Sequence, residues 1–214
     1  MKNYLARNAS GHAAVFGAAL VVMSLAIIWA ARIVLSRSVY VSELGAKEEP
    51  TAGWFEGALL LLVAGGYCVT WASRHLRSRA PLIRSWSPSV SLAIASSLFL
   101  VASQVPCTKG CPLPVGPSFT WQDLIHTTVA VLAFGMAAVA MLQVSFLDRH
   151  ARLRRISLVC CGLVATVAAA GGLMSLTRFH TELGSVFEFV ATTIGIGWLA
   201  LLGVAVAYSP PVRE

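Results

Sequence analysis

The chain has 214 residues, of which 57% are hydrophobic and only 12% are charged, and its mean hydropathy is +0.76. Soluble domains are about 45–50% apolar and about 25% charged, so this composition excludes an ordinary soluble domain and indicates a membrane protein. The formal net charge of +7 is carried mainly by short basic segments between apolar ones, so it needs no nucleic-acid partner.

Six apolar segments follow one another, each long enough to cross about 30 Å of hydrocarbon. In chain order they cover residues 13–35, 54–73, 88–105, 121–147, 156–177 and 186–208. We therefore expect an all-α polytopic membrane protein with six transmembrane helices in three hairpins. The transmembrane domain would cover 13–208, with short cytoplasmic tails at 1–12 and 209–214.

The Lys and Arg residues set the expected orientation. Eleven of the sixteen fall on the side that holds both termini: Lys2, Arg7, Arg74, Arg77, Arg79, Arg84, Arg149, Arg152, Arg154, Arg155 and Arg213. Cytoplasmic loops carry an excess of basic residues, so both termini are expected in the cytoplasm and the protein in the cytoplasmic (inner) membrane. The basic loops at 74–84 and 149–155 would meet anionic lipid headgroups, and no protein partner is required.

The expected outer loop at 106–118 contains Cys107 and Cys111 on either side of Thr-Lys-Gly. Because this loop would face an oxidising compartment, we predict a local disulfide between the two cysteines. Three residues separate them, so the pattern is not the Cys-x-x-Cys redox motif.

Three of the expected helices begin at the outer face with similar sequences. Each start reads as a cap, two residues and an acid: Gly53-Trp-Phe-Glu56, Thr120-Trp-Gln-Asp123 and Ser185-Val-Phe-Glu188. An acid at the third helical position complements the free N–H groups and the helix dipole, for about 0.3–1 kcal/mol each. Helix capping alone is therefore one interpretation of these acids.

Four motifs together resemble one family. They are Ser42-Glu-Leu-Gly45, Pro106-Cys-Thr-Lys-Gly-Cys-Pro112, Asp123-Leu-Ile-His126 and Trp198-Leu-Ala-Leu-Leu202. With them the sequence resembles, over about residues 13–208, a family of six-span prokaryotic membrane proteins known only as a domain of unknown function, number 998. This resemblance implies a fold and carries no established activity.

The candidate catalytic residues are ionisable groups near the expected outer face: Glu56, Asp123, His126 and Glu188. Ionisable groups at membrane depth are expensive and usually have a function. Asp123 and His126 are three residues apart, so they share one face of a helix. A partly desolvated carboxyl group can act as a general acid. His126 lies a turn deeper than Asp123, and capping does not explain it.

Aromatic residues and one arginine at the same level are the expected substrate-binding residues: Trp54, Phe55, Trp121, Phe187 and Arg178. Aromatic faces stabilise cations, so an acid beside them suits acid-initiated isomerisation or cyclisation of an isoprenoid-like lipid. The alternative for these rings is an ordinary interfacial aromatic belt. Asp123 and His126 could supply two metal ligands, but no second His-x-x-x-His or Glu-x-x-His pair is present, so we expect no metal and no cofactor.

Two functions follow from this pattern. The first is a small membrane enzyme whose outward-facing acid and histidine pocket acts on a hydrophobic lipid or isoprenoid-like substrate. The second is a non-catalytic accessory or lipid-binding subunit whose acids only cap helices.

Overall fold

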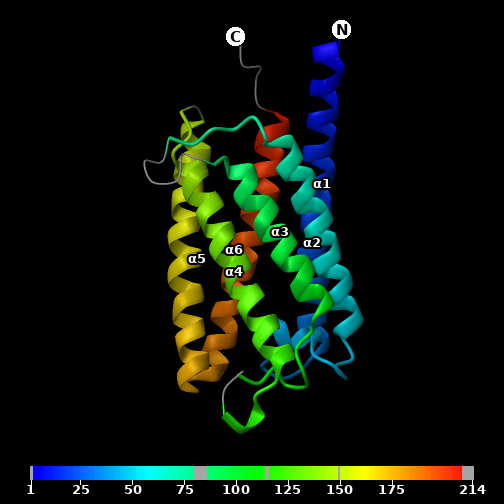
Figure 1. Cartoon of the computed structure of the whole chain (residues 1–214), viewed down its shortest axis with the longest axis vertical. Coiled ribbons are helices and arrows are strands. Elements are labelled where there is room, and N and C mark those ends of the chain that lie inside the picture. The colour runs from blue at the N-terminus through cyan, green and yellow to red at the C-terminus, as the bar shows by residue number, and fades with distance from the viewer. Residues whose placement is uncertain (1, 80–85, 114–115, 149, 209–214) are drawn as a thin grey trace.

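The computed structural model of the protein describes residues 2–79, 86–113, 116–148 and 150–208, and in these residues every regular element is helical. The six α-helices are α1 (Lys2–Val34), α2 (Ala52–Ala72), α3 (Pro88–Gln104), α4 (Trp121–Ser145), α5 (Ala151–Thr177) and α6 (Thr181–Ala207). Two 3₁₀ turns, η1 (Ser42–Gly45) and η2 (Gly116–Ser118), lie in the connections before α2 and α4. The helices form one upright bundle, with the start of α1 and the end of α6 at the same end (Figure 1).

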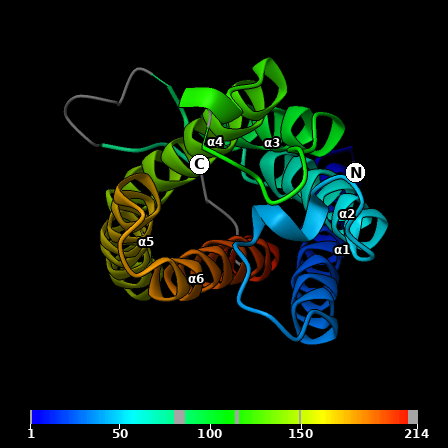
Figure 2. The same cartoon turned by 90° about the horizontal axis from the view of Figure 1, so that it is seen from below.

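The helices follow one another around a ring. Each helix packs against the next one in the chain, and α6 closes the ring by packing against α1. Contacts across the ring are sparse, and α6 makes them with α2 and α4. Figure 2 shows this order around the bundle, viewed along its long axis. A ring of six helices with few contacts across it leaves room for a central cavity.

Five helical segments are long and apolar enough to cross a membrane: Ala9–Val34, Ala52–Ala72, Trp121–Ser145, Ala151–Thr177 and Thr181–Ala207. The sixth helix, α3, is apolar but has only 17 residues. The protein is thus a multi-pass helical membrane protein, as its composition predicts. Helix α1 begins at Lys2, so it starts before the apolar segment Ala9–Val34.

The three similar helix starts turn out to differ. Thr120 caps α4, and its hydroxyl accepts a hydrogen bond from the Asp123 N–H at 3.0 Å, so the predicted cap at this helix start is confirmed. The other two predictions are wrong. Helix α2 begins after Thr51, which places Glu56 beyond the first turn, and α6 begins after His180, which places Glu188 about two turns into the helix.

Small residues bring α2 close to both of its neighbours, as the Gly65-Gly66 pair in the sequence predicts. A Cβ atom on Gly65 would lie 2.7 Å from the Gly17 carbonyl oxygen of α1. A Cβ atom on Gly66 would lie 2.5 Å from the Ser96 hydroxyl of α3. Neither position has room for a side chain, so these glycines set the spacing of three consecutive helices.

Two connections, residues 35–51 and 105–113, close the end of the bundle at which α2, α4 and α6 begin. We call them the cap. The Lys47 N–H donates to the Cys107 carbonyl oxygen at 3.1 Å, and the Lys109 ammonium pairs with Glu48 at 3.1 Å. The Thr51 hydroxyl donates to the Leu44 carbonyl oxygen at 2.9 Å and ties the cap to the start of α2. The two cap segments are therefore joined to each other and to the bundle.

Candidate functional site

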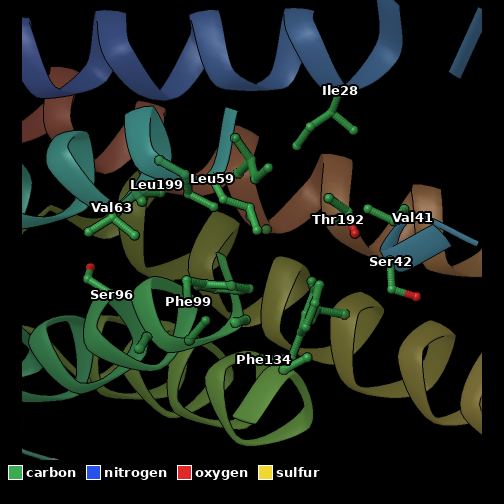
Figure 3. A pocket seen from close by; sticks show the side chains of 18 of the residues that line it. Ile28, Val41, Ser42, Leu59, Val63, Ser96, Phe99, Phe134, Thr192 and Leu199 are labelled. Atoms are coloured by element: carbon green, nitrogen blue, oxygen red, sulfur yellow. The ribbon is translucent and has the colours of Figure 1, made fainter. Parts of the chain in front are cut away.

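A cavity lies inside the ring, beneath the cap. All six helices and η1 contribute to its wall, and the empty space, including the open side, is about 990 Å³. Most lining side chains are aliphatic or aromatic (Figure 3). The aromatic ones are Phe55, Phe99, Phe134 and Trp198. A mostly apolar chamber with a few polar groups is typical of a site for a hydrophobic molecule.

The ionisable residues of the cavity lie near its cap end. They are His126 from α4 and Glu188 from α6, on helices that make few direct contacts with each other. Ser42 of η1 and Thr192 of α6 add hydroxyl groups to the same wall. The cavity therefore brings one acid and one histidine together with an apolar chamber.

The cap holds the carboxyl group of Glu188. The backbone N–H of Val41 donates to its Oε2 at 3.0 Å, and the backbone N–H of Ser42 also faces this carboxyl group. A carboxyl group has about four acceptor sites, so these contacts leave capacity on the side that faces the cavity. Glu188 is thus fixed in place and still able to meet a bound molecule.

His126 is 5% exposed, and its Nδ1 lies 2.7 Å from the Val105 carbonyl oxygen. Since a carbonyl oxygen can only accept, Nδ1 donates this hydrogen bond, and a neutral ring then has its lone pair on Nε2. A ring nitrogen of His126 also lies within 4.8 Å of the sulfurs of Cys107 and Cys111. His126 lines the central cavity, and a neutral imidazole can act as a proton acceptor.

Asp123, in contrast, is fully buried and does not line the cavity. Its carboxylate accepts from the Thr108 N–H at 2.8 Å, from the Thr108 hydroxyl at 2.8 Å and from the Thr120 hydroxyl at 2.5 Å. These contacts join the start of α4 to the cap. Asp123 and His126 thus bind different partners although they are one turn apart, and the geometry gives Asp123 a structural role.

Glu56 is exposed and lines a second hollow beside the cap, with an empty space of about 730 Å³. His126 and Phe55 lie between this hollow and the central cavity, since both residues line both spaces. Of the four predicted catalytic residues, the structure therefore brings His126 and Glu188 to the central cavity and leaves Asp123 and Glu56 outside it.

The predicted substrate-binding residues are likewise divided. Phe55 is 6% exposed and lines the central cavity. Trp54 and Trp121 are 52% and 71% exposed, and Arg178 is an exposed residue at the end of α5. Phe187 is half-buried but does not line the cavity. The exposed tryptophans fit the aromatic belt that the sequence left as an alternative.

Sequence reasoning missed most of the cavity wall. On α4 the lining residues are His126, Ala130, Phe134, Ala137 and Met141, which recur every three or four positions. This spacing marks one helix face, and the alternation of alanines with larger residues along it was the available signal. On α6, Glu188 and Thr192 begin a similar face that continues through Ile196 and Leu199.

The predicted disulfide is confirmed: Cys107 and Cys111 are joined by an S–S bond of 2.00 Å. Cys107 is buried against the cap, with its sulfur 3.6 Å from the Ser42 carbonyl oxygen. Because the two sulfurs are bonded to each other, they are not metal ligands together with His126 in this form. The bridge lies in the cap segment whose Thr108 donates to Asp123 and whose Val105 carbonyl oxygen contacts His126.

The cap also contains Tyr40, whose ring reaches the start of α6. A Cβ atom on Gly184 would lie 2.8 Å from the Tyr40 hydroxyl oxygen, so this glycine makes room for the ring. Burial raises the pKa of the Tyr40 phenol, and the phenol therefore stays protonated at neutral pH.

Comparison with known proteins identifies one family. The family model described as "Protein of unknown function (DUF998)" matches residues 13–205. No curated protein and no solved structure matches the chain significantly.

Proposed function

The chain belongs to the family of proteins of unknown function DUF998, and we propose that it is a small membrane enzyme that uses acid–base chemistry on a hydrophobic substrate in its central cavity. One observation carries this proposal: Glu188 and His126, from two different helices, line the same mostly apolar chamber. Ionisable groups inside a membrane protein are expensive, and those that face a cavity mark substrate or proton sites.

The proposed reaction is an isomerisation or cyclisation started by a proton. Protonated Glu188 gives its proton to one carbon of a substrate double bond, which leaves a carbocation on the neighbouring carbon. The lone pair of His126 Nε2 then removes a proton from an adjacent carbon, and a new double bond forms. One proton enters and one leaves, so the product is an isomer of the substrate, and return of a proton from His126 to Glu188 completes the cycle.

The aromatic lining supports this chemistry. Phe55, Phe99, Phe134 and Trp198 present rings to the cavity, and ring faces stabilise a nearby cation by about 0.5–2 kcal/mol each when water is excluded. The Trp198 N–H donates to the Ser157 hydroxyl at 2.9 Å, which fixes the position of that indole. A fixed aromatic wall protects a carbocation better than exposed rings at an interface.

The alternative function is a non-catalytic lipid-binding or accessory subunit. The observation that favours it is the behaviour of Asp123, whose hydrogen bonds all serve the helix start and the cap. Glu188 also accepts a hydrogen bond from the cap, so its carboxyl group has a structural contact as well. In this case the cavity would hold a lipid without changing it.

The experiment that separates these functions is mass spectrometry of total lipids from cells that express wild type, Glu188→Gln or Glu56→Gln at equal levels. The enzyme predicts that one lipid species disappears, or its isomer accumulates, with Glu188→Gln. Glu56→Gln is the matched acid-to-amide control outside the central cavity and should keep the wild-type pattern. Identical lipids in all three strains, with both variants folded, would favour the binding subunit.

We also propose that both termini are cytoplasmic and that the cap faces outward across the cytoplasmic membrane. The described basic residues Arg74, Arg77 and Arg79 lie after the end of α2 that is opposite the cap, as the excess of positive charge in cytoplasmic loops predicts. The Cys107–Cys111 disulfide lies in the cap, and disulfides persist in oxidising compartments.

A further inference from the structure

The hydroxyl group of Thr192 in the cavity wall is buried and has no partner within the protein. Thr192 is 6% exposed, and its Oγ1 is buried without a hydrogen bond. Four such atoms occur among the described residues, and Thr192 is the one of the four that lines the central cavity. Buried polar groups are normally paired, so an unpaired one in a cavity wall points to a partner that the cavity receives.

The neighbouring Thr193 shows how a threonine hydroxyl on this helix is normally paired. The Thr193 hydroxyl donates to the Phe189 carbonyl oxygen one turn earlier, at 2.7 Å, and accepts from the Trp29 indole N–H at 3.1 Å. Thr193 does not line the cavity. The difference between the two threonines is therefore one of surroundings rather than of residue type.

Glu188 precedes Thr192 by four residues on α6, and both line the cavity. Residues four apart on a helix are neighbours, with Cβ atoms about 5–6 Å apart. A single ligand oxygen can therefore reach the Glu188 carboxyl group and the Thr192 hydroxyl together. Figure 3 shows Thr192 beside Val41 and Ser42, at the cap end of the chamber.

The charges of the lining residues limit which functional group can carry this ligand oxygen. None of the lining residues in the described part of the chain is Lys or Arg. A phosphate or carboxylate head would then lie beside the Glu188 carboxyl group with no Lys or Arg to compensate its charge, which is unfavourable in an apolar chamber. Apart from His126, Ser42 and Ser96, the remaining wall is apolar, so the body of the ligand is hydrophobic.

We infer that the ligand is a long-chain alcohol, an uncharged lipid with one hydroxyl head. Its O–H donates to the Glu188 carboxyl group, and its oxygen accepts from the Thr192 hydroxyl. A carbonyl head would accept from Thr192 but donate nothing to Glu188. An ammonium head would donate to Glu188 but leave the Thr192 proton unpaired. This inference rests on the proposed function and names the substrate class of the same site.

The test is a binding series of four ligands that share one isoprenoid chain, three with different polar heads and one with none. Purified full-length protein in lipid nanodiscs is titrated with farnesol, farnesylamine, farnesyl diphosphate and the hydrocarbon farnesene, and bound ligand is measured by native mass spectrometry. We expect farnesol to bind about tenfold more tightly than the other three, which corresponds to one well-made buried hydrogen-bond pair. Diphosphate or amine binding equal to that of the alcohol would overturn the inference, and so would a lack of binding by all four.

Two isosteric variants locate the head. Thr192→Val removes the unpaired hydroxyl and should weaken farnesol binding about tenfold, to the level of farnesene. Thr193→Val removes the neighbouring hydroxyl outside the cavity and should leave farnesol binding unchanged. Equal affinities for farnesol in the two variants, both with wild-type melting curves, would contradict the assignment of the hydroxyl head to Thr192.

Ligand binding can be measured without catalysis. The binding test and the lipid analysis can therefore contradict the alcohol head and the enzyme activity independently of each other. Farnesol selectivity that depends on Thr192, together with unchanged cellular lipids in Glu188→Gln, would leave an alcohol-binding protein without the proposed enzyme activity. If cellular lipids change with Glu188→Gln but the protein does not prefer farnesol, the proposed enzyme activity is supported and the inference of an alcohol head is wrong.

Discussion

At the scale of single residues, Asp123 and Glu188 show how two similar acids acquire different roles. Asp123 accepts three hydrogen bonds from Thr108 and Thr120 and is fully buried. Glu188 also receives a backbone hydrogen bond, yet it lines the cavity. Asp123 has no free space beside its carboxylate and joins α4 to the cap, whereas Glu188 borders the cavity and is the candidate catalytic acid.

Replacing Asp123 should therefore destabilise the protein rather than alter chemistry directly. Asp123→Ala leaves the Thr108 N–H and two hydroxyl groups without their acceptor, so we expect the free energy of unfolding to fall by about 2–4 kcal/mol. The measurement is thermal unfolding in nanodiscs, followed by circular dichroism. Glu56→Ala is the control, because Glu56 is exposed and should change the melting temperature little. Equal melting temperatures of the two variants would contradict the structural role of the Asp123 hydrogen bonds.

The Ser42-Glu-Leu-Gly45 motif ends in glycine because a larger residue at position 45 would clash with a neighbouring side chain. A Cβ atom on Gly45 would lie 2.4 Å from Cδ1 of Phe55, whose ring lines the cavity. Gly45→Ala should push this ring into the cavity, lower stability by about 1–3 kcal/mol and weaken the binding of any ligand there. Gly53→Ala is the matched control, since nothing lies within 4 Å of its Cβ position. The melting curves and ligand affinities of the two variants give the comparison, and a shift shared by both would rule out the steric explanation.

At the scale of elements, the cap determines how the cavity closes. Its two segments are tied by the backbone bond from Lys47 to Cys107 and by the ion pair of Lys109 with Glu48. The same segments hold Glu188 and His126 through the backbone of Val41 and Val105. The positions of the candidate acid and base therefore depend on loops, and the helices alone do not fix them.

Opening the Cys107–Cys111 bridge should loosen this arrangement. The bridge closes a short loop, so its loss should cost about 2 kcal/mol from chain entropy. We expect a lower melting temperature and faster hydrogen exchange of the cap amides in Cys107→Ser/Cys111→Ser. A thiol reductant should have the same effect on the wild type and no effect on the double variant. Unchanged exchange of residues 105–113 would show that the hydrogen bonds hold the cap without the bridge.

At the scale of the whole molecule, the ring of helices explains why a small membrane protein has an interior space. Consecutive helices pack side by side, the last closes on the first, and few contacts cross the middle. The glycines of α2 hold α1 and α3 close, while the face of α4 that lines the cavity alternates alanines with larger residues. The cavity is a consequence of this arrangement rather than of any single helix.

The proposed orientation can be tested with single cysteines. In a background with Cys68, Cys160 and Cys161 replaced by alanine, Ser38→Cys lies in the cap and Arg77→Cys lies at the opposite end. A membrane-impermeant maleimide should label the first variant in intact cells and the second only after permeabilisation, because the cap is expected to face outward. The reverse pattern would mean that the termini face outward and that the cavity opens on the cytoplasmic side.

Much of the fold could be predicted from local sequence. Hydropathy indicates the apolar helices, because a membrane-spanning helix needs a long apolar segment of its own. The spacing of Cys107 and Cys111 predicts their bridge, and Thr120 with Asp123 predicts one helix cap. The starts of α2 and α6 were misplaced by a few residues, since Thr51 and His180 precede them and hydropathy does not define the first residue of a helix.

The candidate site depends on tertiary structure. The sequence by itself determined a multi-pass helical protein with acids and a histidine near one end of the bundle. Only the packing decided that Glu188 and His126 face one cavity, that Asp123 binds Thr108 of the cap, and that Thr192 is left unpaired. The physical reason is range: hydropathy and capping act within a few residues, whereas the bond from Val41 to Glu188 joins residues 147 positions apart.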